Sequence, residues 1–409
     1  MSSSASKVVF VNRYFHPDRS ATSQLLTDLA SALADAGFNV CVICSRQRYD
    51  EARARLLPRD SIRGVGVYRV WTTCFGRSRL LGRALDYATF YVSSTWQMIQ
   101  LLKPGDTVVA KTDPPLISIM AMMAAKLKGA NLVNWLQDVF PEVASLLGAN
   151  PLPSVLDALL RRCRDASLRR ARVNVVLGGR MRELVQRAGV PPERIQIIEN
   201  WADLHPDEPK PVAESVLRSK LDCADKFVIG YSGNLGRAHE HQTLLGAAEL
   251  LRSDADIVFL MIGGGAGMTQ LARDVEQRGL ANFRFLPYQP RELLSDSLAA
   301  ADAHWVSLRP ALEGLIVPSK FYGILAAARP VIFIGDSDGE LARDIRVSGC
   351  GAVVAVGESG ELARLLRAWK SHPDRRESMG RRGYQHYCDR YAAPRAFDRW
   401  TALLRQGGT

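Results

Sequence analysis

Along the first half of the chain, short apolar runs alternate with stretches in which apolar residues recur with helical spacing. The runs at residues 7–12, 38–45, 64–71, 106–112, 130–138, 173–179 and 194–200 have the length and composition of buried strands. Amphipathic patterns at residues 23–37, 118–129 and 180–189 lie among these runs and predict helices. Strands that alternate with helices in this way predict a parallel sheet with helices on both faces.

The second half repeats the alternation after a polar, proline-bearing stretch at residues 201–215 that is typical of a linker. Strand patterns occur at 226–236, 255–265, 281–288, 303–310, 330–335 and 350–356, and helix patterns at 241–253, 268–279, 291–302, 320–328 and 338–349. We therefore predict two doubly wound, Rossmann-like α/β domains, residues 1–205 and 206–390, which face a cleft, and a last helix within residues 391–409. Ligands of such sheets bind beyond the carboxyl ends of the strands.

Bulk composition agrees with a folded cytoplasmic protein. A length of 409 residues exceeds one ordinary core and favours two domains. The first residues lack the pattern of a secretory signal, and the longest uncharged run, residues 87–102, is too short to span a bilayer. The seven scattered cysteines indicate reduced thiols; Cys41 and Cys44 form a CxxC inside a predicted strand without a second ligand pair, so we expect no metal.

Charge is concentrated in the first half of the chain. Residues 1–205 carry 27 Lys and Arg against 17 Asp and Glu, a net charge of +10, whereas the remainder carries 26 against 25, a net charge of +1. The densest basic cluster comprises Arg161, Arg162, Arg164, Arg169, Arg170 and Arg172. A solvated helix face explains such a cluster; together with the apolar stretches at 87–102 and 114–130 it also fits a peripheral contact with an anionic membrane. Nucleic acid is not expected as a partner, because no recognition module is present.

Three predicted strand ends in the second half combine glycine or proline with the start of a helix. Gly233 and Gly236 precede Arg237, and Gly263 and Gly264 precede the helix at 268–279. Ser319 precedes Lys320 at the third place, so a cation stands at the positive end of a helix. Glycines also serve simple turns, but the three places meet at one edge of one sheet. A diphosphate bound there would explain the lysine, because it would meet helix-end N–H groups together with Arg237 and Lys320.

A nicotinamide dehydrogenase is disfavoured as the class of enzyme. Its fingerprint requires an acidic residue at the end of the strand that follows the glycines, where it holds a ribose hydroxyl. In this chain that strand ends in Leu286, Pro287 and Tyr288, and none of these residues is acidic.

Several stretches resemble the GT-B glycosyltransferases of family 4, in particular the bacterial branch that builds O-antigen, capsule and exopolysaccharide. They are VVFVNRYFHPDRSATSQLLTDLASALADAG, WLQDVFPE, YSGNLGRAH, IGGGAG and GLIVPSKFYGILAAARPVI. The resemblance implies a retaining, metal-independent transferase of hexosyl or N-acetylhexosaminyl type. In it the second domain binds a nucleoside diphosphate-sugar, UDP- or GDP-linked, the first domain binds the acceptor, and the last helix crosses back to the first domain.

The same resemblance assigns residues to roles. Arg237 and Lys320 would stabilise the leaving diphosphate, Glu313 would reach a sugar hydroxyl, and Asp138 with Glu142 would orient the acceptor or the transferred sugar. The predicted contacts of the nucleotide-sugar are Gly233, Asn234, Gly236, Gly263, Gly264, Tyr288 and Ser319. The second glutamate of the family's pair is missing, and Glu340 is its candidate replacement on the ribose.

The basic, partly apolar first domain suits an acceptor sugar linked to polyprenyl diphosphate, at the inner face of the plasma membrane. Two other functions stay open at this point. A GT-B-fold epimerase would also bind a UDP-sugar, and a non-catalytic partner of a biosynthetic complex would bind a sugar nucleotide without turning it over.

Overall fold

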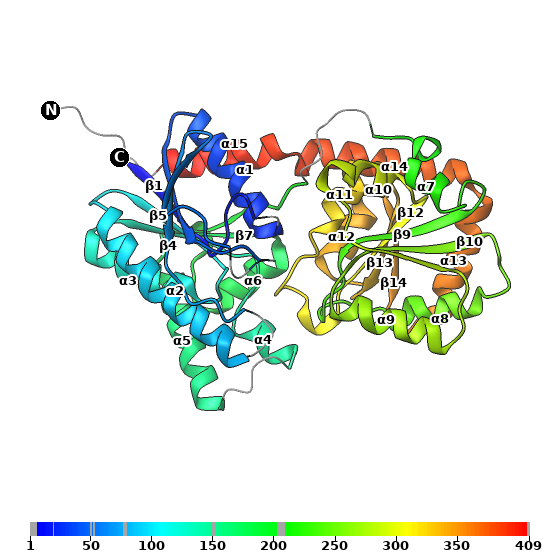
Figure 1. The fold of residues 1–409 in the computed structure, drawn as a ribbon, viewed down its shortest axis with the longest axis horizontal. Coiled ribbons are helices and arrows are strands. Elements are labelled where there is room, and N and C mark those ends of the chain that lie inside the picture. Colours follow the sequence, from blue (N-terminus) through cyan, green and yellow to red (C-terminus); the bar gives the residue numbers. More distant parts are fainter. Residues whose placement is uncertain are drawn as a thin grey trace. The chain divides into compact units, whose positions relative to one another are not determined.

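The computed structural model describes residues 6–18, 20–49, 51, 54–76, 80–148, 153–202 and 209–406 (Figure 1). The chain divides into two compact units, each with its own sheet. Unit 1 comprises Met1–Glu199 and Ala396–Thr409, and unit 2 comprises Asn200–Arg395. The sequence places the division at residue 205; that position, with the rest of 203–208 in the predicted linker, lies outside the described residues.

Unit 1 contains an eight-stranded sheet with strand order β3-β4-β2-β1-β5-β6-β7-β8. Its strands are β1 (Lys7–Val11), β2 (Asn39–Ser45), β3 (Arg59–Ile62), β4 (Val65–Val70), β5 (Thr107–Lys111), β6 (Asn131–Trp135), β7 (Val173–Val176) and β8 (Ile195–Ile197). Its helices are α1 (Ala21–Asp35), α2 (Leu80–Leu101), α3 (Ile117–Lys128), α4 (Glu142–Leu146), α5 (Ser154–Arg170), α6 (Gly179–Arg187) and a 3-10 turn at Pro192–Arg194.

The doubly wound α/β fold is confirmed, with one local exception. All paired strands of unit 1 run parallel except β3, which pairs with β4 in the antiparallel direction. β3 lies between the predicted strands at 38–45 and 64–71, in a stretch where the sequence predicts no strand. Arg63 and Gly64, both with positive φ, allow the tight reversal between β3 and β4.

Unit 2 contains a six-stranded parallel sheet with strand order β11-β10-β9-β12-β13-β14. The strands are β9 (Phe227–Asn234), β10 (Ile257–Gly264), β11 (Phe283–Leu286), β12 (Ala303–Ser307), β13 (Val331–Gly335) and β14 (Gly351–Ala355). The helices are α7 (Val216–Lys220), α8 (Gln242–Leu250), α9 (Ala266–Gln277), α10 (Leu294–Ala299), α11 (Lys320–Ala326), α12 (Glu340–Ser348), α13 (Ser359–Ser371) and α14 (Pro373–His386). Single 3-10 turns lie at Val212–Glu214, Arg291–Leu293 and Pro310–Leu312, and a π-helical turn at Tyr387–Tyr391.

Both faces of the unit 2 sheet are covered by helices, with α8 and α9 on one side and α10, α11 and α14 on the other (Figure 1). Consecutive residues of β10 accordingly enter two different cores. Phe259 and Met261 join the cluster that includes Trp305, whereas Leu260 and Ile262 join a smaller one. This is why the central strands are continuously apolar in sequence.

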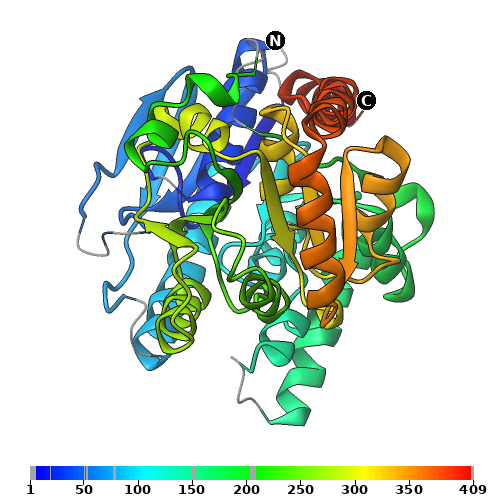
Figure 2. The same cartoon turned by 90° about the vertical axis from the view of Figure 1, so that its right-hand side faces the viewer.

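The C-terminal stretch, orange to red in Figure 2, consists of α13, α14 and α15 (Ala393–Arg405). From Ala396 onward, α15 belongs to unit 1. Trp400 is fully buried there, Arg399 forms an ion pair of 2.7 Å with Glu199, and Arg172 donates a hydrogen bond of 3.0 Å to the carbonyl oxygen of Leu403.

Of the helices in the described ranges, none combines the length and the apolar character needed to cross a bilayer.

Candidate functional site

In each sheet the chain first adds strands on one side of its first strand and then returns to add strands on the other side. This change of side is the strand-order reversal, or reversal point, of the sheet. In unit 1 the chain leaves β1 toward β2 and β4 and later returns to pair β5 with β1; in unit 2 it leaves β9 toward β10 and β11 and returns to pair β12 with β9. The connections diverge at these points and leave a crevice beyond the carboxyl ends of the strands.

Lys320 lies at the reversal point of unit 2 and is held by groups from β9 and from the loop that follows it. Its ammonium lies 5.1 Å from the centroid of the Tyr231 ring and 3.5 Å from Nε2 of His239. Its aliphatic stem runs along Gly233, where an added Cβ would come 3.0 Å from Cε of the lysine. Burial lowers the pKa of Lys320 to about 8, so the group is mostly a cation at pH 7 and becomes neutral in mildly alkaline solution.

His239 holds the lysine as a hydrogen-bond acceptor. Its Nδ1 lies 2.7 Å from the carbonyl oxygen of Ser307, the last residue of β12, so this nitrogen carries the proton and donates it. The lone pair of Nε2 then faces the ammonium of Lys320. Burial and the neighbouring lysine lower the pKa of His239 to about 4. The imidazole is thus neutral at physiological pH.

The two glycine loops of unit 2 pack directly against each other. A Cβ on Gly263 would overlap the carbonyl oxygen of Gly233, and both glycines have positive φ. The backbone N–H of Leu235 donates a hydrogen bond to the carbonyl oxygen of Gly264, and the backbone N–H of Gly267 donates one to the carbonyl oxygen of Leu235, each at 2.8 Å. Part of the glycine requirement therefore comes from this loop contact, and the amides of residues 235 and 267 are already used within the protein.

The remaining contacts predicted for the nucleotide lie at the same edge of the sheet. Asn234 ends β9, and Gly236 with Arg237 follows it; the Arg237 side chain is exposed and makes no hydrogen bond or ion pair with any other described residue. The exposed Tyr288 follows β11, and its ring lies against Gly264, where an added Cβ would come 3.0 Å from the ring. Ser319 is exposed directly before Lys320.

Glu313 and Glu340 are brought together, but in a way that the sequence does not indicate. One carboxylate oxygen of Glu313 accepts a hydrogen bond of 2.7 Å from the backbone N–H of Glu340, the first residue of α12. Glu313 therefore caps this helix, and its charge is favourable at the helix N-terminus. Glu313 thus contacts the main chain of Glu340, and the Glu340 carboxylate takes no part in this hydrogen bond.

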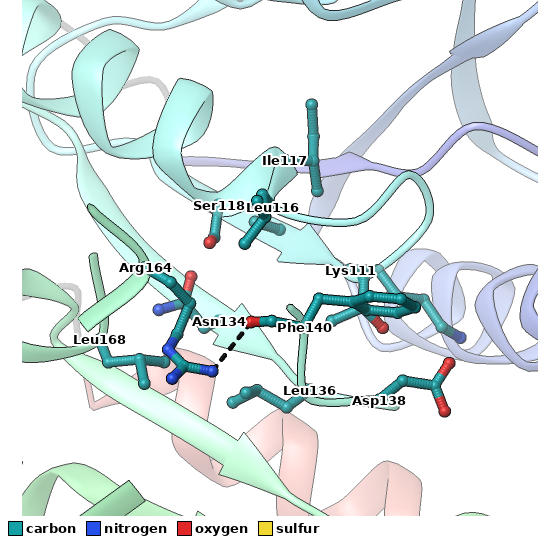
Figure 3. Close-up of a pocket in the computed structure, with 12 residues that line it drawn as sticks. Lys111, Leu116, Ile117, Ser118, Asn134, Leu136, Asp138, Phe140, Arg164 and Leu168 are labelled. Atoms are coloured by element: carbon teal, nitrogen blue, oxygen red, sulfur yellow. Dashed lines mark hydrogen bonds between the residues drawn. The ribbon is translucent and has the colours of Figure 1, made fainter. Parts of the chain in front are cut away.

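Asp138 lies in unit 1, in the loop that follows β6 at the carboxyl edge of the sheet. Burial and the neighbouring Asp113 raise the pKa of Asp138 to about 6, and the cation of Lys111 opposes this rise. Asp138 and Lys111 line one cavity of about 30 Å³ (Figure 3). Its other lining residues are Ala110, Thr112, Leu116, Ile117, Ser118, Asn134, Leu136, Phe140, Arg164 and Leu168.

Glu142, the second acid of the WLQDVFPE stretch, is engaged in ion pairs. Arg164 binds both of its carboxylate oxygens, at 2.7 and 3.0 Å, and Arg161 binds one of them at 2.6 Å. Such a two-pronged contact fixes the start of α4 against α5. Glu142 is therefore a structural residue in unit 1.

Arg13, just after β1 at the reversal point of unit 1, was not singled out by the sequence analysis. Its buried guanidinium contacts Asp86 of α2 at 3.4 Å and Gln47 at 3.3 Å. Asp86 also accepts hydrogen bonds from Thr73 and from the backbone of Phe75 and Gly76. This network ties α2 and the loop after β4 to the edge of the sheet where β1 ends.

Within the described residues, no group of three or more His, Cys, Asp or Glu side chains is arranged to hold a metal ion. Cys41 and Cys44 are both buried and free.

Comparison with known proteins identifies the family. A family model described as a glycosyl transferase 4-like domain matches residues 21–201, and one described as glycosyl transferases group 1 matches residues 216–386. Two curated relatives carry provisional names. The chain is 27% identical over 290 residues to the glycosyltransferase WbjE of Pseudomonas aeruginosa, 71% of this chain and 72% of that protein. It is 28% identical over 271 residues to the colanic acid biosynthesis glycosyl transferase WcaI of Escherichia coli (strain K12), 64% and 66% of the two chains.

Solved structures show the same architecture. Sucrose-phosphate synthase of Thermosynechococcus elongatus superposes with a TM-score of 0.78 at 14% identity, over 98% of both chains. Anabaena HepE in complex with UDP-glucose superposes with a TM-score of 0.72 at 15% identity, over 98% of this chain and 99% of that one. At such identities the likeness shows the fold alone. The fold and the two matched models together define a glycosyltransferase. More particularly, the chain belongs to the GT-B glycosyltransferases of family 4, as its motifs predicted.

Proposed function

We propose that this glycosyltransferase moves a sugar from a nucleoside diphosphate-sugar to an acceptor sugar linked to polyprenyl diphosphate, with retention of the anomeric configuration, in the synthesis of a bacterial surface polysaccharide. The observation that carries the donor assignment is the placement of Lys320. A half-buried ammonium, aligned by Tyr231, His239 and the stem contact with Gly233, stands at the strand-order reversal of unit 2. A preorganised cation in that position suits a diphosphate.

The negative charge that develops in the proposed reaction suits the cations of unit 2. When the acceptor oxygen bonds to the anomeric carbon, the bond from that carbon to the diphosphate oxygen breaks and negative charge grows on the leaving group. Lys320 and Arg237 would stabilise that charge without a divalent ion, and we expect turnover to persist in EDTA. In our proposal the acceptor hydroxyl approaches the face from which the diphosphate departs, and a diphosphate oxygen takes its proton.

The similar proteins agree with this proposal. HepE was crystallised with UDP and with UDP-glucose, and WcaI is named for colanic acid, a polysaccharide. We therefore expect a uridine or guanosine diphosphate-sugar, with a hexose or N-acetylhexosamine as the transferred group.

A membrane contact for unit 1 is supported by α2, and less by the arginine cluster that the sequence singled out. Arg161 and Arg164 are paired with acids, and Arg169 and Arg172 donate to the carbonyl oxygens of Ala188 and Leu403. These arginines mostly serve contacts within unit 1. Only Arg162 and Arg170 of the cluster are exposed without such bonds to described residues.

Helix α2 presents apolar residues to solvent along one side. The exposed residues Leu81, Leu85, Val92 and Trp96 recur at spacings that place them in one stripe over four turns. Next to the stripe, Trp71 and Trp96 line a cavity of about 400 Å³ together with Arg46 and Arg59. An apolar helix stripe with interfacial tryptophans and adjacent arginines suits an anionic bilayer surface.

The donor and the reaction type are tested together. The protein is incubated with a panel of nucleotide-sugars, with and without a membrane extract that supplies lipid-linked sugars, and free nucleoside diphosphate is measured. Acceptor-dependent release supports transfer. Conversion of the donor without acceptor would identify an epimerase, and binding without either reaction would identify a non-catalytic partner.

The membrane contact is tested by vesicle sedimentation with Val92→Glu, using vesicles that contain about one-third phosphatidylglycerol. Val92 is 73% exposed, so the change costs little stability but places a charge in the stripe. We expect several-fold weaker binding. Val347→Glu, at an equally exposed valine of unit 2 (83%), is the matched control. Equal binding by the two variants would remove α2 from the proposal.

A further inference from the structure

Lys111, the last residue of β5, is a buried cation to which neither the sequence nor the proposed reaction gives a role. Its side chain has no exposed surface, its ammonium donates a hydrogen bond of 3.0 Å to the carbonyl oxygen of Thr22, and it lies 3.7 Å from the centroid of the Trp135 ring. Lys111 and Trp135 are register partners in β5 and β6, which brings their side chains together. Burial lowers the pKa of Lys111 well below its usual value.

Carboxylates from three segments act against this desolvation. Asp28 of α1, Asp113 in the loop after β5, and Asp138 in the loop after β6 each favour the charged form of Lys111. A lysine so deeply buried persists where neighbouring charges and an aromatic face stabilise it. Lys111 is therefore the centre of an electrostatic cluster at the reversal point of unit 1.

The effect on Asp138 is reciprocal. Burial and Asp113 favour the protonated carboxyl, and Lys111 is the neighbouring cation that favours the carboxylate. Arg164 lines the same cavity, but its guanidinium is bound to Glu142 and Asp165. Lys111 thus favours the charged form of Asp138, against burial and Asp113.

Figure 3 shows the ends of Lys111 and Asp138 directed to the same side of the cavity that both line. The cavity, about 30 Å³, has room for one group of the size of a water molecule or a hydroxyl. A single hydroxyl of an acceptor sugar fits this size and chemistry, since a carboxylate accepts its hydrogen bond.

The C-terminal helix supports the ring on which Lys111 rests. Trp400 of α15 packs against Trp135 with ring centroids 5.0 Å apart and planes inclined by 62°. Both rings are buried, and the indole N–H of Trp400 has no hydrogen-bond partner among the described residues, so packing alone sets its position. Trp135 is held between the lysine on its own sheet and a helix that enters unit 1 from the far end of the chain.

We infer that Lys111 is a positioning residue for glycosyl transfer, which holds the Asp138 carboxylate ready for an acceptor hydroxyl, and that Trp400 fixes the lysine through Trp135. The inference rests on the proposed function, because it takes Asp138 to be the group that meets the acceptor. Lys111 has no exposed surface and its ammonium is hydrogen-bonded to the carbonyl oxygen of Thr22, so we assign it a role through Asp138.

The test uses Lys111→Met, which keeps the length of the side chain and removes its charge, with Lys111→Arg as the charge-keeping variant. The titration of Asp138 is followed in the full-length protein by carbon-13 NMR of aspartate carboxyl groups, with its signal assigned through Asp138→Asn. The pH profile of kcat/KM for the acceptor is measured in parallel. Since the carboxylate is the active form, kcat/KM falls as pH falls through the pKa of Asp138.

We expect Lys111→Met to raise the titration midpoint of Asp138 by more than one unit and to move the acid limb of kcat/KM by the same amount. This lowers kcat/KM at pH 6.5 about fourfold or more relative to its plateau, and Lys111→Arg leaves both midpoints near those of the unsubstituted protein. An unchanged Asp138 titration in Lys111→Met overturns the inference, whatever the turnover. A shifted titration with an unshifted acid limb overturns the positioning role, while acceptor-dependent transfer itself still stands.

Trp400→Leu provides a second variant should Lys111→Met fail to fold. We expect it to raise the Asp138 midpoint by a smaller amount, because Lys111 loses its fixed ring. The matched control is Trp369→Leu, a similarly buried tryptophan in the core of unit 2, which should leave that midpoint unchanged. Equal midpoints in both tryptophan variants overturn the part assigned to α15. If no nucleotide-sugar supports transfer by the unsubstituted protein, the proposed function fails with the positioning role, and the NMR titration still measures the coupling of Lys111 to Asp138.

Discussion

Replacement of Lys320 by arginine should remove the alkaline limb of the pH profile of kcat/KM for the donor. In the proposed reaction Lys320 stabilises the diphosphate only in its cationic form, and burial places its pKa at about 8. About nine-tenths of the free enzyme therefore carries this charge at pH 7 and about one-tenth at pH 9. The predicted decline of kcat/KM between these two pH values is close to tenfold. The guanidinium of the variant stays charged throughout this range.

The arginine must occupy space shaped for lysine, since the stem of Lys320 runs along Gly233. We therefore expect a lower plateau, about 10- to 100-fold below that of the unsubstituted enzyme, as for a displaced charge-stabilising group. Lys320→Ala removes the cation altogether and should cost on the order of 100-fold or more in kcat, about 3 kcal/mol in the transition state.

The assay is a continuous measurement of nucleoside diphosphate release with saturating acceptor, at limiting donor, from pH 6 to 10. Lys370→Arg serves as the control, because Lys370 is paired with Asp256 on the surface of unit 2. Two results would refute the reasoning. One is a flat profile between pH 7 and 9 in the unsubstituted enzyme; the other is an alkaline limb that persists at the same pH in an active Lys320→Arg variant.

Three further outcomes follow from the structure. Binding of UDP at pH 8 should take up about half a proton, because the diphosphate raises the pKa of Lys320. Calorimetry in two buffers of different ionisation enthalpy measures this proton uptake. A binding heat that does not depend on the buffer would contradict the prediction. Gly263→Ala should lower the free energy of unfolding by about 2 kcal/mol or more in urea titrations, because the new methyl overlaps the Gly233 carbonyl at a positive φ, whereas Gly360→Ala, in open space within α13, should not destabilise. Glu313→Ala should cost about 1 kcal/mol of stability through loss of the α12 cap, and Glu313→Gln, which retains an acceptor, should cost less; equal costs would argue against the cap.

The candidate site of unit 2 could be located from sequence because the carboxyl ends of its strands and their glycines lie within short stretches of chain. The strand that ends in Gly233 and the helix that begins at Lys320 are both visible as local patterns. What the pattern could not reveal is the use of individual groups. Glu313 caps a helix, and the backbone N–H of Gly267 donates its hydrogen bond to the carbonyl oxygen of Leu235. Such choices depend on which loops become neighbours.

Lys111 and Arg13 were not identified from the sequence for the same reason. In sequence, Lys111 is one polar residue at the end of an apolar run, which is also what a surface lysine at a strand end looks like. Arg13 likewise follows a strand without any local sign that its partner lies on α2. Position alone is a signal that points to both residues, since Lys111 ends β5 and Arg13 follows β1, the two strands that flank the strand-order reversal of unit 1.

The alternation of apolar and amphipathic stretches by itself determined the doubly wound fold and the edge of the unit 2 sheet that carries the glycines, because strand and helix periodicities are properties of neighbouring residues. The tertiary structure decided the rest. The order of strands, the antiparallel β3, the approach of His239 to Lys320, and the stacking of Lys111, Trp135 and Trp400 all join residues distant in sequence. Such contacts form only when whole elements pack, and their electrostatic consequences, a lysine with a pKa near 8 and an aspartate with a pKa near 6, arise from the burial that packing creates.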